Sequence, residues 1–303
     1  MKKSAFPDKG VWLKGNIHCH STVSDGCYTP EEIIVKYHDR GYDFLSITDH
    51  NIIKKHNTIF PDMILFEGVE HDLTYSKYKN LHVVGISTKE NAETNYDCKK
   101  YMPEDLSMQE MIDLMHNDSQ FVSVAHPIWS RLEPEEIASL ENFDAVEVFN
   151  NGCENLCHAG HGEVYLDLLL RRGKRIFATA VDDTHKPIDL FGGWIELKAS
   201  EKTKESILEA LFKGYYYSTS GPKIYDFQIE KDLVYVNCSP SKEIHIISWP
   251  PRGKSFFAHN DNLMTECTYT LKGEERYIRI ECIDVDGKTA WTNPLLFSKK
   301  EGV

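Results

Sequence analysis

The stretch Asn16-Ile17-His18-Cys19-His20 ends an apolar run with two histidines that lie two residues apart. Alternate side chains of a β-strand share one face, so both imidazoles can reach one metal ion while Cys19 between them points away. In parallel α/β folds, the ends of buried strands carry the chemistry. This stretch therefore predicts a buried strand that delivers metal ligands at one edge of a sheet.

Further apolar runs repeat this arrangement, each with a histidine or a carboxylate at or near its end. They occupy residues 44–50, 65–70, 81–84, 121–127 and 177–185, and they supply His50, Glu70, His82, His126, Asp183 and His185. Asp25 adds a carboxylate in the loop after the first run. Imidazole suits zinc, iron and manganese, and carboxylates suit harder ions. A mixed set of this size predicts more than one divalent metal ion.

The register of these strands leaves some ligand assignments open. Glu70 ends its run and could bridge two ions, but Glu67 lies three residues earlier, on the opposite face of a regular strand. Asp182 is likewise the register alternative to Asp183. Asp49 would face away from the site, so we expect it to position a ligand rather than to bind metal.

Several cations side by side lower the pKa of a bridging water, so that hydroxide forms near neutral pH. The same ions clamp the oxygens of a phosphoryl or acyl group, and no separate nucleophile is then needed. The sequence contains neither a Gly-x-Ser-x-Gly elbow nor a P-loop, which removes two competing mechanisms. We therefore expect a hydrolase in which a metal-bridging hydroxide attacks the substrate.

Two cationic residues follow predicted ligands in loops at the same end of the fold. Arg131 comes soon after His126, and Lys186 comes directly after His185. A phosphate group needs cationic donors, so we expect both side chains to contact a phosphorylated substrate. The alternative for each is a solvated surface charge.

Up to about residue 220, strand-like runs alternate with helix-like ones, which predicts a parallel sheet with helices outside it. The predicted strands cover 12–18, 43–48, 63–69, 81–86, 120–125, 144–149, 175–181 and 193–198. Capping boxes predict helix starts after Thr29 and Ser107, and further helices are predicted over 134–140, 161–172 and 203–213. Ligands from so many strand ends can meet only if the sheet closes. We therefore favour an irregular (β/α) barrel over a doubly wound sheet.

The pattern changes near Ser220-Gly221-Pro222. Short runs of high strand propensity follow, separated by turn signals such as Lys272-Gly273 and Asp286-Gly287. They cover 224–230, 233–238, 243–249, 264–271, 276–284 and 289–297. We therefore predict a hydrolase barrel over residues 1–220 and a small β-sandwich domain over residues 221–303.

The chain has 303 residues and a formal net charge of −13, so stable binding of nucleic acid by a basic surface is not expected. Polar residues and Pro7 follow the start, where a signal peptide would have an apolar segment, and no run approaches the ~20 apolar residues that span a bilayer. The eight cysteines include no CxxC pair. Cys153 and Cys157 could hold a structural zinc with nearby histidines, although their spacing is unusual. We expect a cytoplasmic protein with reduced thiols and no membrane contact.

In order and spacing, the motifs around the predicted ligands resemble those of the PHP (polymerase and histidinol phosphatase) domain. They are His18-Cys-His20, Ser24-Asp25-Gly26, Thr48-Asp49-His50-Asn51, Glu70, His82, Ala125-His126-Pro127 and Asp183-Thr-His185. The resemblance covers about residues 12–220. It implies a distorted seven-stranded (β/α) barrel with two or three divalent ions, commonly manganese, iron or zinc.

The resemblance also assigns the ligands to three ion positions. The first would be held by His18, His20, Glu70 and Asp183, the second by Glu70, His82 and His126, and the third by Asp25, His50 and His185. Glu70 would bridge the first two ions. We expect catalysis to depend on His20, Glu70 and Asp183, assisted by Arg131 and Lys186.

Further stretches resemble a bacterial branch of stand-alone PHP proteins, the carbaryl-hydrolase-like (CehA/McbA) branch. They are Glu147-Val-Phe-Asn150, Gly192-Gly193-Trp194, Tyr217-Ser-Thr-Ser-Gly221-Pro222 and Ala290-Trp291-Thr292-Asn293-Pro294. The leading expectation is a phosphoesterase that acts on a small phosphorylated molecule. The alternatives are hydrolysis of a carboxyl or carbamate ester, exonuclease action on short oligonucleotides, and a binding protein with structural metals. The oligomeric state stays open.

Overall fold

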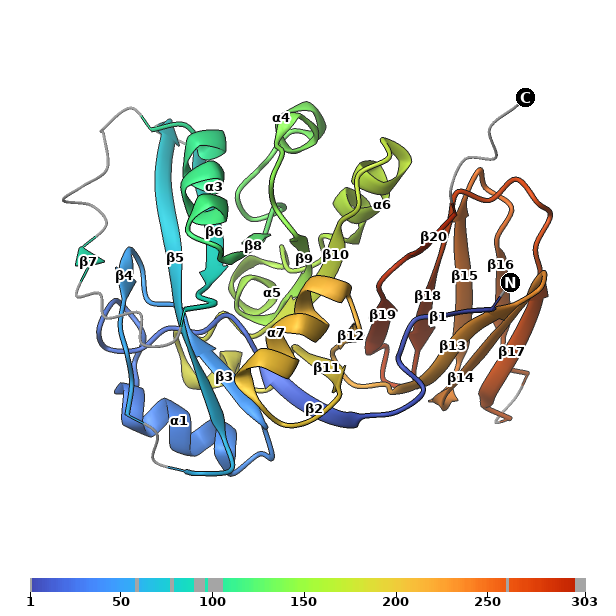
Figure 1. The fold of residues 1–303 in the computed structure, drawn as a ribbon, viewed down its shortest axis with the longest axis horizontal. Helices are drawn as coiled ribbons and strands as arrows, with labels where there is room; N and C mark the ends of the chain where they lie inside the picture. The colour runs from blue at the N-terminus through green and yellow to red at the C-terminus, as the bar shows by residue number, and fades with distance from the viewer. Residues whose placement is uncertain are drawn as a thin grey trace.

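The computed structural model describes residues 2–57, 60–76, 79–89, 96–97, 106–259 and 262–297. Helices flank one long mixed sheet, and a second sheet packs beside its C-terminal part (Figure 1). The chain is thus a mixed α/β protein, in agreement with the predicted class.

Seven strands form the N-terminal part of the long sheet. In sheet order they are β10 (Phe177–Val181), β9 (Ala145–Asn150), β8 (Phe121–Val124), β6 (Lys79–Ile86), β5 (Ile64–Ser76), β3 (Phe44–Ile47) and β2 (Val11–Asn16). Six of them share one direction, and β6 alone runs against its neighbours β5 and β8. The prediction of a parallel sheet is wrong at β6, because the two residues between β5 and β6 are too few for a parallel crossover.

The reversal of β6 decides where His82 lies. In the antiparallel register, His82 stands opposite Asp72, two residues beyond Glu70 in β5. The beginning of β6 therefore reaches the edge of the sheet at which the other six strands end.

The first and last of these strands meet through the residues that follow them. The backbone N–H of Asp183 donates to the His18 carbonyl at 2.9 Å, and the N–H of His20 donates to the Thr184 carbonyl at 3.1 Å. Two ligand-bearing segments that lie far apart in the sequence are thereby fixed side by side.

Helices connect the strands and cover them. They are α1 (Pro30–His38), α3 (Met108–Asn117), α4 (Pro134–Ser139), α5 (Asn151–Cys157), α6 (Glu163–Arg171), α7 (Lys204–Lys213) and the short 3-10 helix η1 (Pro187–Asp189). Both predicted capping boxes are present, with Thr29 at the start of α1 and Ser107 at the start of α3. No prediction covers α5, which begins directly after β9 and is capped by Asn150.

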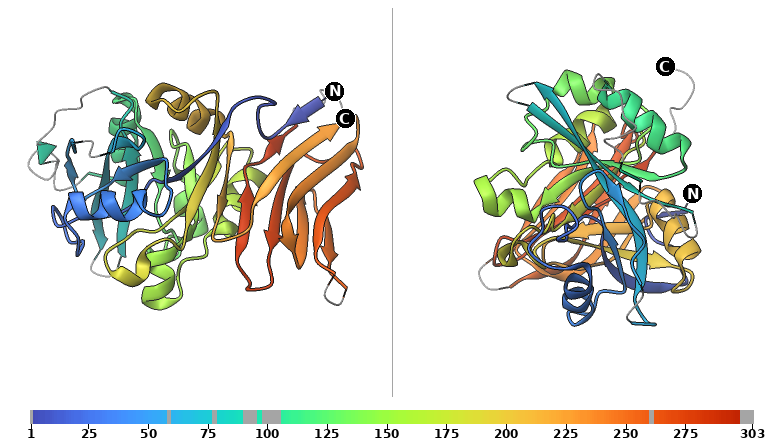
Figure 2. Two further views of the ribbon diagram at one scale, coloured as in Figure 1. Left: turned by 90° about the horizontal axis from the view of Figure 1, so that it is seen from below. Right: turned by 90° about the vertical axis from the view of Figure 1, so that its left-hand side faces the viewer.

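The long sheet continues into the C-terminal strands. Beyond β2 its order is β11 (Trp194–Ala199), β12 (Tyr216–Thr219), β19 (Thr289–Thr292), β18 (Tyr277–Ile283), β15 (Glu243–Trp249) and β16 (Lys254–Phe257), with β20 (Leu295–Leu296) on β18. The second sheet contains β1 (Lys2–Ser4), β13 (Ile224–Glu230), β14 (Leu233–Ser241) and β17 (Met264–Thr270) (Figure 2). The short strands β4 (Ile52–Ile53) and β7 (Tyr96–Asp97) pair separately. The division predicted at residue 220 stays a prediction, and the β12–β19 pairing crosses it.

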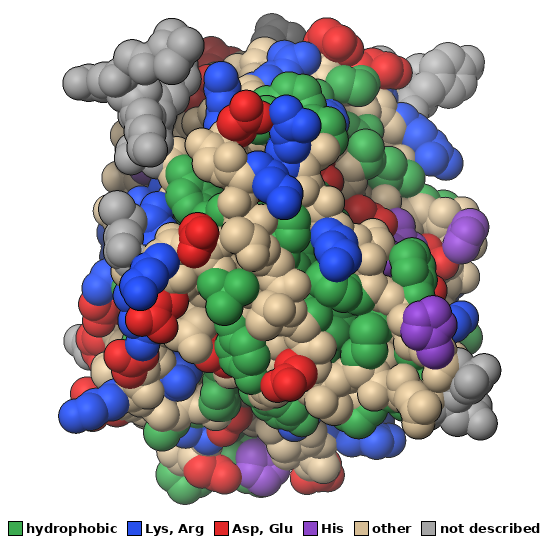
Figure 3. Space-filling view, turned by 90° about the vertical axis from the view of Figure 1, so that its right-hand side faces the viewer, with side chains coloured by type: hydrophobic (Ala, Val, Ile, Leu, Met, Phe, Trp, Pro, Cys, Tyr) green, Lys and Arg blue, Asp and Glu red, His purple; other side chains and the backbone are tan. Residues whose placement is uncertain are grey.

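Buried side chains of the second sheet and of the C-terminal strands of the long sheet form one cluster, which includes Phe227, Val236 and Ile280. Figure 3 shows the outer surface at this end of the molecule, where hydrophobic side chains are interspersed with charged ones. Trp291 of β19 is buried and stacks on Phe149 of β9, with ring centroids 5.7 Å apart. The cores of the N-terminal and C-terminal parts therefore meet. Among the described residues, no helix has both the length and the apolarity to cross a membrane.

Candidate metal centre

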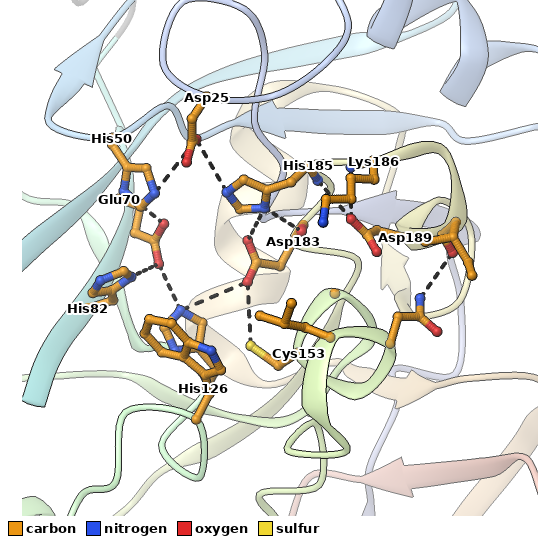
Figure 4. Close-up of a pocket in the computed structure, with 15 residues that line it drawn as sticks. Asp25, His50, Glu70, His82, His126, Cys153, Asp183, His185, Lys186 and Asp189 are labelled. Atoms are coloured by element: carbon orange, nitrogen blue, oxygen red, sulfur yellow. Dashed lines mark hydrogen bonds and ion pairs between the residues drawn. The ribbon is translucent and has the colours of Figure 1, made fainter. Parts of the chain in front are cut away.

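Nine side chains predicted as metal ligands come together where the six parallel strands end. Their nitrogen and oxygen atoms fall into overlapping groups, and within each group the ligand atoms lie within 4.8 Å of one another. Figure 4 shows those that surround the adjoining pocket, with Glu70 and Asp183 between the histidines. The nine are His18, His20, Asp25, His50, Glu70, His82, His126, Asp183 and His185.

The first group consists of His18, His20, Glu70 and Asp183. The Nε2 atoms of the two histidines lie 3.2 Å apart. Glu70 Oε2 lies 3.3 and 3.1 Å from these nitrogens, and Asp183 Oδ1 lies 3.2 Å from both. A tetrahedral ion with bonds of about 2.0–2.1 Å separates its ligand atoms by about 3.3 Å. The four atoms therefore stand at the spacing that one tetrahedral ion requires.

The Glu70 carboxylate lies at the centre of the cluster, within reach of five histidines. Its Oε1 lies 2.9 Å from His82 Nδ1 and 3.0 Å from His126 Nε2. Its Oε2 belongs to the first group and also lies 3.2 Å from His50 Nδ1. A carboxylate that presents each oxygen to a different set of imidazoles is placed to bridge two ions.

Asp25 stands at the open side of the cluster. Its Oδ1 lies 3.3 Å from His185 Nε2 and 3.8 Å from His50 Nε2, and its side chain is 56% exposed. Because His50 presents Nδ1 to Glu70 and Nε2 to Asp25, it can serve either the second or the third position. The ligand atoms of the third group therefore lie farther apart than those of the first, and the third group is more exposed to solvent.

The donor set fits divalent metal ions. Glu70 Oε2, Asp183 Oδ1 and His50 Nδ1 are buried and have no hydrogen-bond partner in the described structure. A buried carboxylate oxygen without a partner costs free energy, and a cation within the cluster would remove that cost. His18 Nδ1 lies 2.7 Å from Glu147 Oε1, so its Nε2 is left with a lone pair that faces the cluster.

The charges in the cluster also call for cations. Burial raises the pKa of Glu70 and Asp183, but the surrounding histidines outweigh it and hold both values well below the usual range. Burial lowers the pKa of His20, yet the neighbouring carboxylates of Asp183 and Glu70 raise that pKa to about 9. Two ionised carboxylates therefore share a buried site, which positive charge must balance.

The geometry distinguishes the register alternatives. Glu67 Oε2 accepts from Lys204 Nζ of α7 at 3.0 Å, outside the cluster. Asp182 accepts from Tyr37 OH at 2.7 Å and from the N–H groups of residues 191–193 at 2.7–2.8 Å. Neither carboxylate is among the grouped ligand atoms of the described residues. Glu70 and Asp183 are the carboxylates that the strand register delivers.

Asp49 organises the loop that leads to Asp25. Its two oxygens accept from the N–H and hydroxyl of Ser21 at 2.8 and 2.7 Å, and from the N–H and hydroxyl of Ser24 at 3.2 and 2.7 Å. These four bonds fix the loop conformation. The placement agrees with the expectation that Asp49 positions a ligand.

Glu147 of β9 supports the cluster from behind. Its Oε1 lies 2.7 Å from His18 Nδ1, and its Oε2 accepts from the backbone N–H of His126 and from Asn150 Nδ2, both at 2.8 Å. Asn150 Nδ2 also donates to Asp183 Oδ2 at 3.0 Å. No contact of Glu147 with the ligands is among the predictions, although an acidic residue inside the apolar run 145–149 was the available signal.

The cluster opens into a cavity of about 530 Å³. Besides the ligands, its lining includes Trp129, Cys153, Leu156, Lys186 and Ile188. Cys153 Sγ lies 3.8 Å from Asp183 Oδ2 and forms a further group of possible ligands with His126 and Asp183, and burial raises the pKa of its thiol. Cys157 is exposed, and no ligand group of the described residues contains it, so the structural-zinc alternative gains no support.

The two predicted phosphate contacts are placed differently. Lys186 lines the cavity beside His185. Arg131 is exposed and is not among the described residues that line the cavity. Its Nη1 donates to the Ile128 carbonyl at 3.1 Å, within the turn that follows His126. The structure therefore does not bring Arg131 together with the other predicted site residues.

Comparisons with known proteins agree with this geometry at the level of the fold. No family profile matches the chain. A two-domain protein from Bacteroides vulgatus, described as containing a PHP-like metal-dependent phosphoesterase, aligns over 96% of this chain and 97% of its own, with 17% identity and a TM-score of 0.52. The chain shares the fold of that PHP-like protein. A protein from Bifidobacterium adolescentis that is described as a metal-dependent phosphoesterase aligns over 69% of this chain and 97% of its own, with 17% identity and a TM-score of 0.43.

One curated relative matches part of the sequence. The DNA polymerase/3'-5' exonuclease PolX of Bacillus subtilis is 26% identical over 125 residues, which is 40% of this chain. The match spans only 21% of the length of PolX.

Proposed function

We propose that this chain is a metal-dependent phosphoesterase that hydrolyses a small phosphorylated substrate. The observation that carries the proposal is a set of four buried ligand atoms at the spacing of one tetrahedral ion, beside a cavity that Lys186 also lines. The fold shared with a PHP-like protein supports it.

The proposed cofactors are two or three divalent ions, with manganese, iron and zinc as candidates. His18, His20, Glu70 and Asp183 would hold the first, Glu70 with His82 and His126 the second, and Asp25 with His185 the third, while His50 stands between the last two. When bound, such ions activate water and neutralise the charge that develops on phosphoryl oxygens.

The chain's own residues prepare the site for this chemistry. Glu70 Oε2 and Asp183 Oδ1 are buried without a hydrogen-bond partner in the described structure, and Glu147 holds the His18 imidazole so that Nε2 faces the cluster. Lys186 lines the cavity, and its proposed role is to bind a non-bridging phosphate oxygen. We leave Arg131 out of this assignment because its guanidinium is bonded to the Ile128 carbonyl.

We also propose that the seven N-terminal strands form a distorted barrel, with the C-terminal sheets as a β-sandwich beside it. The hydrogen bonds between residues 18–20 and 183–184 support closure of the barrel, since they link the ends of β2 and β10. Membership of the carbaryl-hydrolase-like branch rests on the sequence stretches alone.

The test is elemental analysis of the purified full-length chain, followed by hydrolysis assays after manganese, iron or zinc is added back. We expect two to three ions per chain and metal-dependent release of phosphate from p-nitrophenyl phosphate. We expect Glu70→Gln to lose metal and activity, while Glu67→Gln, a buried glutamate outside the cluster, keeps both. Bound ions that support cleavage of p-nitrophenyl acetate or an aryl carbamate, but not of the phosphate ester, would assign the site to carboxyl or carbamate esters instead.

The partial match to PolX favours one second candidate, exonuclease action on short oligonucleotides. The described cavity lining offers Lys186 alone as a cationic side chain, which is little for a strand with several phosphates. Incubation of the metal-loaded protein with a single-stranded hexanucleotide tests it. Release of mononucleotides at a rate above that for p-nitrophenyl phosphate would favour the exonuclease.

A further inference from the structure

The cavity beside the metal-ligand cluster has an apolar side. Trp129 comes from the segment after β8, Leu156 from α5 and Ile188 from η1, and all three line the cavity. Leu156 is 63% exposed and Ile188 is 69% exposed. A single exposed aliphatic side chain is ordinary, but two that line one functional cavity with a tryptophan form a surface that an apolar ligand group would cover.

The two aliphatic side chains are held by a polar scaffold. Asn155 Nδ2 of α5 donates to the Ile188 carbonyl at 3.0 Å, and Asn151 Nδ2 at the start of α5 donates to the Asp189 carbonyl at 2.8 Å. These bonds tie α5 to η1. The apolar surface of Leu156 and Ile188 is therefore preformed, and binding an apolar group there would cost little ordering of the backbone.

The charges on the polar side of the cavity suit one phosphoryl group. The Asp189 carboxylate accepts hydrogen bonds from the backbone N–H groups of His185 and Lys186, at 3.1 and 2.8 Å. It is therefore engaged within the loop and does not face a ligand as a free carboxylate. Lys186 is the cationic side chain among the described lining residues. One lysine beside a metal cluster suits a single phosphate better than a polyphosphate, and the net charge of −13 opposes a larger polyanion.

We propose that the substrates are phosphate monoesters of apolar alcohols, whose alkyl or aryl group packs on Trp129, Leu156 and Ile188. The inference rests on the proposed phosphoesterase function and names its substrate class. In the reaction a water oxygen forms a bond to phosphorus while the ester P–O bond breaks. The leaving oxygen takes up a proton, so that the ester and one water yield inorganic phosphate and the free alcohol.

Binding of n-alkylphosphonates to the metal-loaded full-length chain tests the apolar side without any turnover. Titration calorimetry would compare methyl-, butyl- and hexylphosphonate, which carry the same head group and differ only in chain length. A buried methylene changes an equilibrium by about fourfold. We expect affinity to rise at least tenfold from methyl to hexyl; affinity that does not change or falls with chain length overturns the proposal.

A pair of variants assigns the effect to the named residues. Leu156→Asn combined with Ile188→Asn should remove most of the dependence on chain length, because both substitutions replace the aliphatic surface with amides. Val164→Asn is the matched control, since Val164 is 58% exposed on α6 and is not among the lining residues. Both substituted positions are exposed, so the fold should survive, which circular dichroism would check. An unchanged dependence in the double variant would reject this surface.

The same series of alkyl phosphate esters separates the failure of this proposal from the failure of the proposed function. We expect kcat/KM to rise with chain length in parallel with phosphonate affinity. Tighter binding of longer phosphonates without release of phosphate from any ester would reject the phosphoesterase function but keep the apolar subsite. Phosphate release at a rate independent of chain length would reject the subsite and keep the function.

Discussion

At the scale of single residues, the cluster depends on side chains that never contact the reacting atoms. Glu147 is buried and orients both the His18 ring and the backbone of His126. Partners of this kind change metal affinity by about 10–100-fold when they are replaced. We expect Glu147→Gln to weaken metal binding by that factor, measured by competition with a chromophoric chelator. Glu67→Gln, which replaces a buried glutamate paired with Lys204, should leave the affinity unchanged.

Neutralising the adjacent residues Asp182 and Asp183 should affect different properties, the stability of the fold in the first case and metal binding in the second. Asp182→Asn removes a carboxylate that accepts four hydrogen bonds, so it should lower the free energy of unfolding by about 1–3 kcal/mol and keep the metal. Asp183→Asn should instead lose bound metal. Urea unfolding of the metal-free proteins and elemental analysis of the loaded ones separate the two effects. The opposite pattern would mean that Asp182 is the ligand.

At the scale of elements, a capping box starts the helix α1, and α1 in turn contacts a residue next to the metal centre. Thr29 accepts from the N–H of Glu32 at 3.2 Å, and the Glu32 carboxylate accepts from the N–H of Thr29 at 2.8 Å. The helix that begins at this cap contains Tyr37, whose hydroxyl donates to Asp182. Thr29→Ala should cost about 1 kcal/mol in urea unfolding because it removes the cap, while Thr29→Ser keeps the hydroxyl and should cost less. Equal stability of the alanine and serine variants would contradict this account.

Strand positions and metal ligands could be predicted because they depend on local patterns. Apolar runs that end in histidine or carboxylate mark both a strand and its chemistry, and most predicted ranges match a described strand to within three residues. The exceptions are β5, which continues seven residues past its predicted end, and the strands β1, β4, β7, β12 and β16, which no predicted range covers. The direction of β6 could not be predicted from strand–helix alternation, since only two residues separate β5 from β6. The helix α5 has seven residues, including Asn and Gly of weak helix propensity, so its sequence gives little signal.

The partners of the ligands could not be predicted because they come from distant segments. Glu147 meets His18 across 129 residues, and Leu156 and Ile188 line one cavity because α5 is hydrogen-bonded to η1. Arg131 shows the converse case. Its nearness to His126 in the sequence suggested a phosphate contact, yet the turn that follows His126 directs the guanidinium to the Ile128 carbonyl.

At the scale of the whole molecule, a buried arginine ties the C-terminal strands to the N-terminal helices. Arg279 of β18 is 1% exposed, and its Nε and Nη2 donate to Asp167 of α6 at 2.8 and 2.6 Å. Burial lowers the pKa of Arg279, but Asp167 and Glu281 outweigh it and raise that pKa, so the guanidinium stays charged. Together with the β12–β19 pairing, this contact should make the chain unfold as one unit.

Asp167→Asn tests that coupling. Removing one partner of a buried ion pair costs about 3–5 kcal/mol, and the cost here should lie near the lower limit because Glu281 Oε1 still accepts from Arg279 Nη1 at 2.5 Å. We expect a single calorimetric transition in both proteins, shifted to lower temperature in the variant. Asp286→Asn, in an exposed turn, is the control and should leave the Tm unchanged. Two separate transitions, with only one of them shifted, would mean that the C-terminal sheets fold independently and that the continuous sheet does not transmit stability to the metal centre.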